Sequence, residues 1–111
     1  MAIGETPNVV FESEPGENRI LDEAEQDLVD GVLFYESQDA GLGDYFLDSL
    51  SADIDSLQLF GGIHPIRSGR HCLLATRCPC AVYYIMVNRV VHVQAVLDCR
   101  RDPAWIKRRL K

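Results

Sequence analysis

Arg77-Cys78-Pro79-Cys80-Ala81-Val82-Tyr83-Tyr84 and, a few residues later, Ala95-Val96-Leu97-Asp98-Cys99-Arg100-Arg101-Asp102-Pro103 are the two runs that decide the fold of this chain. Both contain the β-branched and aromatic side chains that are enriched in strands. Asn88-Arg89 lies between them, and asparagine tolerates the left-handed conformation that tight turns require. The stretch therefore predicts a β-hairpin, with strands at about 80–87 and 90–97, that leads into a basic segment.

The segments on either side of this hairpin extend the prediction. A further strand is predicted at about 70–77, after a loop at 63–69. Pro103 suits the first turn of a helix at about 103–110, with Asp102 as its N-cap. That helix carries Trp105 and Leu110 beside a cationic run at 107–109. The second half of the chain is therefore predicted to be an antiparallel meander followed by a short helix.

The first half predicts two helices joined by a short connection. The first begins with Asp22 as N-cap and Glu25 three residues later, as in a capping box, and runs to about Ser37. Its apolar stripe is Ala24, Leu28, Val32 and Tyr35. The second ends at Gly61-Gly62, and its buried stripe is Leu42, Phe46, Leu50, Ile54 and Leu57, with Leu47 alongside. Gly41-Leu42-Gly43 breaks the first helix, and because the connection is short the two helices should form an αα-hairpin.

The N-terminal segment is predicted to be organised differently from the rest. Residues 1–18 contain Pro15-Gly16 and one short apolar run, Val9-Val10-Phe11. Since proline and glycine interrupt a long strand, we expect an arm that contributes at most one edge strand. Residues 19–111 should form a single domain, because 111 residues are the size of one domain.

Charge is divided unequally between the two halves of the chain. Residues 1–60 contain fifteen carboxylates and one base, which gives −14, and residues 61–111 contain two carboxylates and ten bases, which gives +8. The sum is the net charge of −6. This asymmetry predicts an acidic and a basic region, which either attract each other across the fold or serve a partner. The acidic total disfavours a generic nucleic-acid binder without excluding direct contact with nucleic acid.

The cysteines, histidines and glycines of the sequence predict neither a metal site nor a cofactor site. Cys78-Pro79-Cys80 lacks the C-x-x-C spacing of a zinc site, although Cys72 and Cys78 could face each other across a hairpin. The three histidines are scattered, and there is no Gly-rich phosphate loop. The N-terminus resembles no secretory signal and no apolar run could span a membrane, so we expect a cytoplasmic protein with reduced, buried thiols.

Arginines at the ends of the predicted strands are the candidate binding residues. Arg77, Arg100 and Arg101 flank strand ends, where side chains are held more firmly than on a turn tip such as Arg89. Guanidinium groups make bidentate contacts with carboxylate or phosphate. We therefore expect these three arginines to bind a partner.

The order and spacing of several motifs resemble the RelE/ParE superfamily of bacterial type II toxins, in its ParE-like branch. The similarity covers about residues 20–106. The matching segments are Glu23-Ala24-Glu25-Gln26-Asp27-Leu28, Tyr35-Glu36, Gly41-Leu42-Gly43 with Phe46-Leu47, Arg70 to Leu74, Arg77-x-Pro79-x-Ala81-Val82-Tyr83-Tyr84 and Ala95-Val96-Leu97-x-x-Arg100-Arg101-Asp102-Pro103-x-Trp105.

The resemblance implies an α+β fold, in which a helical hairpin packs on a curved antiparallel sheet of three to four strands, with a short C-terminal helix. It also implies a cognate, acidic-tailed antitoxin as partner and DNA gyrase as a candidate target. On this basis Arg77, Arg100, Arg101 and Trp105 are expected at the working face. Arg67, Arg70 and Arg108 are further candidates for contact with the antitoxin or with phosphate.

Three functions remain open at this point. The first is a ParE-like toxin that inhibits its target by binding and has no catalytic residues. The second is a RelE-like messenger RNA endoribonuclease. That branch carries an arginine in the slot of Ala81, lysines before that strand and a C-terminal tyrosine, and the absence of these groups here disfavours catalysis. The third is a diverged, non-toxic interaction protein with the toxin fold, motivated by the acidic helical half.

Overall fold

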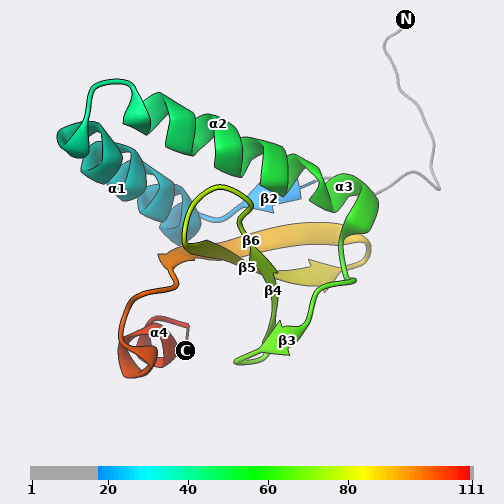
Figure 1. Cartoon of the computed structure of the whole chain (residues 1–111). Coiled ribbons are helices and arrows are strands. Elements are labelled where there is room, and N and C mark those ends of the chain that lie inside the picture. The colour runs from blue at the N-terminus through cyan, green and yellow to red at the C-terminus, as the bar shows by residue number, and fades with distance from the viewer. Residues whose placement is uncertain (1–17, 111) are drawn as a thin grey trace, which may run out of the picture.

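A computed structural model describes residues 18–110 (Figure 1). In chain order the elements are β2 (Asn18–Ile20), α1 (Asp22–Gln38), α2 (Leu42–Asp55), α3 (Leu57–Phe60), β3 (Ile66–Arg67), β4 (Arg70–Leu74), β5 (Cys80–Val87), β6 (Val90–Asp98) and α4 (Pro103–Arg109). The predicted α+β class is confirmed, with the helical hairpin on one side of the sheet and α4 at the other. No helix among the described residues is both long and apolar enough to cross a membrane.

The helical hairpin is closed by contacts between the end of α1 and the start of α2. Gly41 adopts φ 89°, a conformation that glycine reaches without a steric penalty. The Glu36 carboxylate accepts hydrogen bonds from the backbone N–H groups of Gly41 and Gly43. A Cβ on Gly43 would lie 2.9 Å from the carbonyl oxygen of Val32, so this position requires the absence of a side chain.

Two predicted helix boundaries are wrong. The N-cap of α1 is Leu21 rather than Asp22, because the Leu21 N–H donates to Val93 O at 3.0 Å and strand pairing continues to that residue. The second helix is divided at Ser56 into α2 and α3. The Ser56 hydroxyl donates to Asp53 O at 2.5 Å, a local bond of the kind that disturbs helix interiors.

The sheet has five strands, in the order β2-β6-β5-β4-β3. The β5–β6 hairpin lies where the sequence predicts it, and Asn88 and Arg89 take positive φ at its turn. The predicted loop at 63–69 contains the short strand β3, whose turn uses positive φ at Ser68 and Gly69. Strand β4 ends at Leu74 instead of residue 77, because Ala75 N–H already bonds to Cys80 O and the chain turns there.

β2, the edge strand next to β6, departs from the predicted topology. β2 pairs with β6 in parallel, with Asn18 opposite Val91 and Ile20 opposite Val93, whereas the prediction was an antiparallel sheet. A three-residue strand has too little pattern to be read from sequence, and its parallel pairing depends on the crossover through the helices. The predicted strand at Val9-Val10-Phe11 and most of the predicted arm lie outside the described residues.

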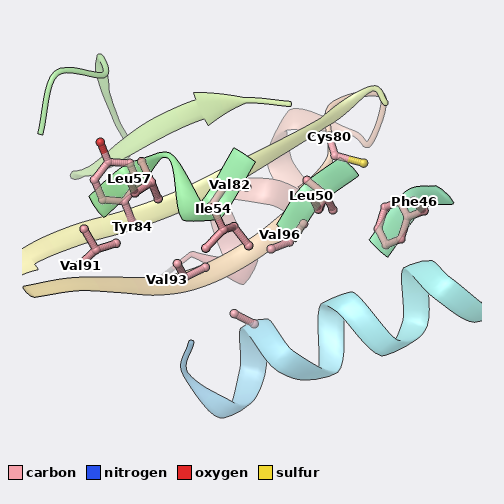
Figure 2. Packing of buried hydrophobic residues seen from close by; sticks show 11 residues of the cluster. Phe46, Leu50, Ile54, Leu57, Cys80, Val82, Tyr84, Val91, Val93 and Val96 are labelled. Carbon is pink, nitrogen blue, oxygen red and sulfur yellow. The ribbon is translucent and has the colours of Figure 1, made fainter. Parts of the chain in front are cut away.

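The two faces of the sheet are buried by different elements. The first apolar cluster lies between the hairpin and the sheet, and Figure 2 shows its members from α2, β5 and β6 converging above α1. Most of the predicted stripes are confirmed here, since Ala24, Phe46, Leu50, Ile54 and Leu57 are buried and Leu28, Val32 and Tyr35 pack against them. Leu42 is not part of this cluster, and Leu47 is exposed. The second cluster lies under α4 and contains Cys72, Ala81, Tyr83, Ala95, Leu97 and Leu110, with Trp105 and Ile106 packed against it.

Candidate functional site

A cleft of about 440 Å³ lies where the end of β6 meets α1 and α4. Its lining combines apolar and charged side chains: Asp27, Asp30, Gly31, Phe34, Tyr35, Phe46, Cys80, Val96, Leu97, Asp98, Arg101, Trp105 and Arg109. Concave sites with an apolar floor and a few converging polar groups are the usual binding sites of proteins. We refer to it as the C-terminal cleft.

Arg101 and Trp105 form one wall of the C-terminal cleft. The guanidinium carbon of Arg101 lies 4.1 Å from the centre of the Trp105 ring, a cation–π contact worth about 0.5–2 kcal/mol. The predicted cap of α4 is confirmed, because Asp102 accepts a hydrogen bond from Ala104 N–H at 3.1 Å and Pro103 occupies the first turn. The cap holds Trp105 one helical turn away from Arg101, so the stacked pair presents a cation on an aromatic surface.

A charged pair connects α4 to the rest of the cleft. Arg109 Nη2 lies 2.6 Å from Asp27 Oδ2, which also accepts a hydrogen bond from Val96 N–H at 3.0 Å. Burial raises the pKa of Asp27, although the bonds from Val96 and Arg109 act in the opposite direction. These two donors therefore oppose the effect of burial on the Asp27 carboxylate. Arg109 was not among the predicted site residues, because nothing in its local pattern distinguishes it from its basic neighbours.

Arg100 is held by the turn that follows β6. Its Nη2 lies 2.7 Å from Asp98 Oδ2, and its backbone N–H donates to Asp98 Oδ1 at 2.7 Å. The hydrogen bond from Arg100 keeps the pKa of Asp98 below its usual value. The Arg100 side chain remains 62% exposed, so a partner can reach it only in competition with Asp98. Of the predicted site residues, Arg101 and Trp105 therefore line the C-terminal cleft, whereas Arg100 precedes Arg101 in the chain but is not part of the lining.

The remaining predicted site residues lie outside the lining of the C-terminal cleft. Arg77 is exposed on the turn between β4 and β5, which is anchored by two hydrogen bonds from Thr76 to the Asp53 carboxylate. Arg67 and Arg70 face each other across the β3–β4 hairpin. Arg70 bonds to Gln94 and lines a smaller cleft of about 320 Å³ that also includes Arg109. Arg108 is exposed on α4.

The cysteines do not assemble a metal site. Cys72 belongs to the cluster under α4 and Cys78 packs against the opposite cluster, so the predicted facing of these two residues is wrong. Within residues 18–110, no group of three or more His, Cys, Asp or Glu could hold a metal ion. Burial raises the pKa of all four thiols, and Cys99 is exposed rather than buried as expected.

Two of the scattered histidines meet at a buried tyrosine, which the sequence did not indicate. His64 Nδ1 lies 2.6 Å from the Tyr84 hydroxyl, which also accepts a hydrogen bond from Gly62 N–H at 2.9 Å. His71 stacks on the Tyr84 ring and its Nδ1 lies 2.8 Å from His64 O. Burial, and secondarily the charge of His71, lower the pKa of His64. These contacts fix the loop before β3 to the sheet.

Comparison with known proteins gives a match of structure without a match of sequence. No protein-family model matches the chain, and neither does any curated protein. Among solved structures, a chain described as "Chromosomal ParDE TA system from P. aeruginosa" superposes with a TM-score of 0.69 at 14% identity, covering 78% of this chain and 98% of that one. This chain has the fold of a ParDE system component. At this identity the likeness establishes the fold, in agreement with the resemblance read from the motifs.

Proposed function

We propose that this chain is the toxin of a type II toxin–antitoxin system, of the ParE-like kind, which inhibits its target by binding and is neutralised by a cognate antitoxin. The observation that carries the proposal is the structural match to the ParDE component over nearly all of that chain. DNA gyrase is the target we propose, and the cytoplasm is the compartment in which such a toxin would act.

The C-terminal cleft is the proposed contact surface for the target. Its stacked Arg101–Trp105 pair offers aromatic area and a fixed positive charge, and Trp and Arg are the residues that most often dominate interface energies. Arg100, the preceding residue in the chain, adds a second, exposed guanidinium. A partner with an acidic side chain next to an apolar one would satisfy both parts of this surface.

Binding is favoured over ribonuclease catalysis by the environment of Ala81. The resemblance places the arginine of the ribonuclease branch in this slot, where it would neutralise charge on a scissile phosphate. Ala81 is 1% exposed and packs in the cluster under α4. The buried methyl group of Ala81 carries no charge and cannot contribute to phosphate chemistry.

Growth of a bacterial culture after controlled induction of this chain, with the supercoiling of a reporter plasmid measured in parallel, tests the proposal. Arrest with altered supercoiling is expected. The double variant Arg101→Ala, Trp105→Ala should relieve the arrest, whereas Arg89→Ala, which removes an arginine from the β5–β6 turn, should not. New transcript 5′ ends within reading frames would instead indicate the ribonuclease. Normal growth with soluble protein would identify a non-toxic interaction protein.

A further inference from the structure

A second, apolar groove runs along the outer side of α1. It has a volume of about 420 Å³ and is lined by Ile20, Glu25, Leu28, Val29, Val32, Leu33 and Leu47. We call it the outer groove. It lies on the helical hairpin and shares no lining residue with the C-terminal cleft.

The outer groove exposes side chains that a soluble monomer normally buries. Leu33 is 64% exposed and Val29 is 46% exposed. Leu47, which the sequence pattern places with the buried stripe of α2, is 38% exposed and faces this groove instead. The first apolar cluster includes Leu28 and Val32 but neither Val29 nor Leu33. Contiguous exposed apolar residues of this kind mark interaction sites.

The shape of the outer groove fits a helix. Glu25, Val29 and Leu33 follow one another at four-residue spacing and so lie along a single line on α1. Ile20 on β2 and Leu47 on α2 complete the lining from neighbouring elements. An amphipathic helix that lays an i, i+3, i+4, i+7 stripe into such a groove is a recurring mode of recognition.

The charge around the outer groove determines what that helix must carry. Residues 20–60, which supply the whole lining, contain eleven carboxylates and no lysine, arginine or histidine, and two of these carboxylates, Asp27 and Asp30, line the C-terminal cleft instead. Glu25 lines the groove itself, and by helical spacing Asp22 and Glu36 flank the same line on α1, while Asp44 precedes Leu47 by one turn on α2. An occupant therefore needs cationic side chains beside its apolar stripe, since like charges across an interface cost affinity.

We propose that the outer groove docks a basic amphipathic helix of a partner protein. The acidic tail that the resemblance implies for an antitoxin has the wrong charge for this groove. Residues 1–17 of the chain also have the wrong charge, with four carboxylates and no base. The proposal goes beyond the toxin function, because it concerns a different surface and a partner of opposite charge to that tail.

The test uses the full chain and two synthetic peptides of about 18 residues, long enough for measurable helicity. Both carry leucines at i, i+3, i+4 and i+7. The first has lysines on the flanks of this stripe and the second has glutamates in their place. Fluorescence anisotropy of the labelled peptides measures affinity, and amide chemical-shift changes in the protein locate the site.

The lysine peptide is expected to bind and to shift the amides of residues 25–33 and 47, and the glutamate peptide is expected to bind at least tenfold more weakly. Leu33→Asp should weaken binding of the lysine peptide by about tenfold or more, because apolar anchors dominate the affinity of such contacts. Leu59→Asp is the matched control: Leu59 is 72% exposed on α3 and does not line the groove, so its variant should bind normally. Glu25→Lys should reduce the preference for the lysine peptide.

Several results would overturn the proposal. One is equal binding of both peptides, and another is equal loss of affinity in Leu33→Asp and Leu59→Asp. Tighter peptide binding by Phe11→Ser would show that the N-terminal segment occupies the groove, and self-association abolished by Leu33→Asp would show that a second copy does. These measurements use purified protein, so an absence of toxicity in culture would leave them unaffected.

Discussion

Asp27 and Arg109 are 82 residues apart in sequence and form a 2.6 Å ion pair that joins α1 to α4. Their side chains are 13% and 21% exposed, so the pair is largely removed from water. Since Val96 N–H also donates to the Asp27 carboxylate, one residue connects the hairpin, the sheet and the C-terminal helix. The position of α4, and with it the wall of the C-terminal cleft, depends on this contact.

Loss of Arg109 should therefore destabilise the protein. Arg109→Met leaves the Asp27 charge with only the Val96 donor and should lower the free energy of unfolding by about 1–3 kcal/mol. The double variant Asp27→Asn, Arg109→Met should cost less than the two single changes added together. Urea unfolding of all four proteins measures the coupling, and Arg108→Ala on the exposed side of α4 is the control. Strict additivity would show that the pair makes no specific contribution.

The contact between Arg101 and Trp105 should be visible by spectroscopy, because Trp105 is the single tryptophan of the chain. Removing the guanidinium from the indole face in Arg101→Ala should raise the acrylamide quenching constant of Trp105 and cost under about 1 kcal/mol in stability. Arg100→Ala is the matched control, since Arg100 bonds to Asp98. Identical quenching in wild type and Arg101→Ala would mean that the stacked arrangement does not persist in solution.

Gly31 should tolerate no side chain. A Cβ there would lie 2.3 Å from Phe46 Cζ, and the Phe46 ring is 4% exposed and stacked on Tyr35. Gly31→Ala should therefore lower the free energy of unfolding by about 1–3 kcal/mol through overpacking, despite the better helix propensity of alanine. Thermal unfolding checks this. Adding Phe46→Leu, which shortens the opposing side chain, should reduce the penalty of the alanine; a Gly31→Ala variant as stable as wild type would contradict the close packing.

The His64–Tyr84 contact predicts a loss of stability on acidification. Because the pKa of His64 is lowered in the folded state, the unfolded chain binds the proton more readily. The contribution of His64 to folding stability is present above the unfolded pKa of about 6.5 and is lost as the pH falls below that value. Between about pH 6.5 and 5, the free energy of unfolding of His64→Gln should depend less steeply on pH than that of wild type. His92→Gln, which removes an imidazole from β6, is the control, and an unchanged slope in His64→Gln would refute the assignment.

Local patterns in the sequence determined most of the secondary structure and one half of the candidate site. The helical stripes, the β5–β6 hairpin and the α4 cap follow from side-chain periodicity, turn conformation and a capping carboxylate, all of which act within a few residues. Arg100 and Arg101 could be named as candidate site residues because they follow a strand end, and Trp105 because its motif resembles that of the RelE/ParE superfamily. The same kind of local interaction, the Asp102 cap, explains why α4 starts at the predicted residue.

Tertiary structure alone decided the rest, since the responsible contacts join residues far apart in the chain. The parallel pairing of β2 with β6 depends on the crossover through the hairpin, and the role of Arg109 depends on Asp27, which no local pattern connects to it. The joining of His64 and His71 at Tyr84 has the same origin. Leu47 is the clearest case. Helical spacing places it alongside the buried stripe of α2, but only the packing of α1, α2 and β2 decides that it lines an open groove rather than the core.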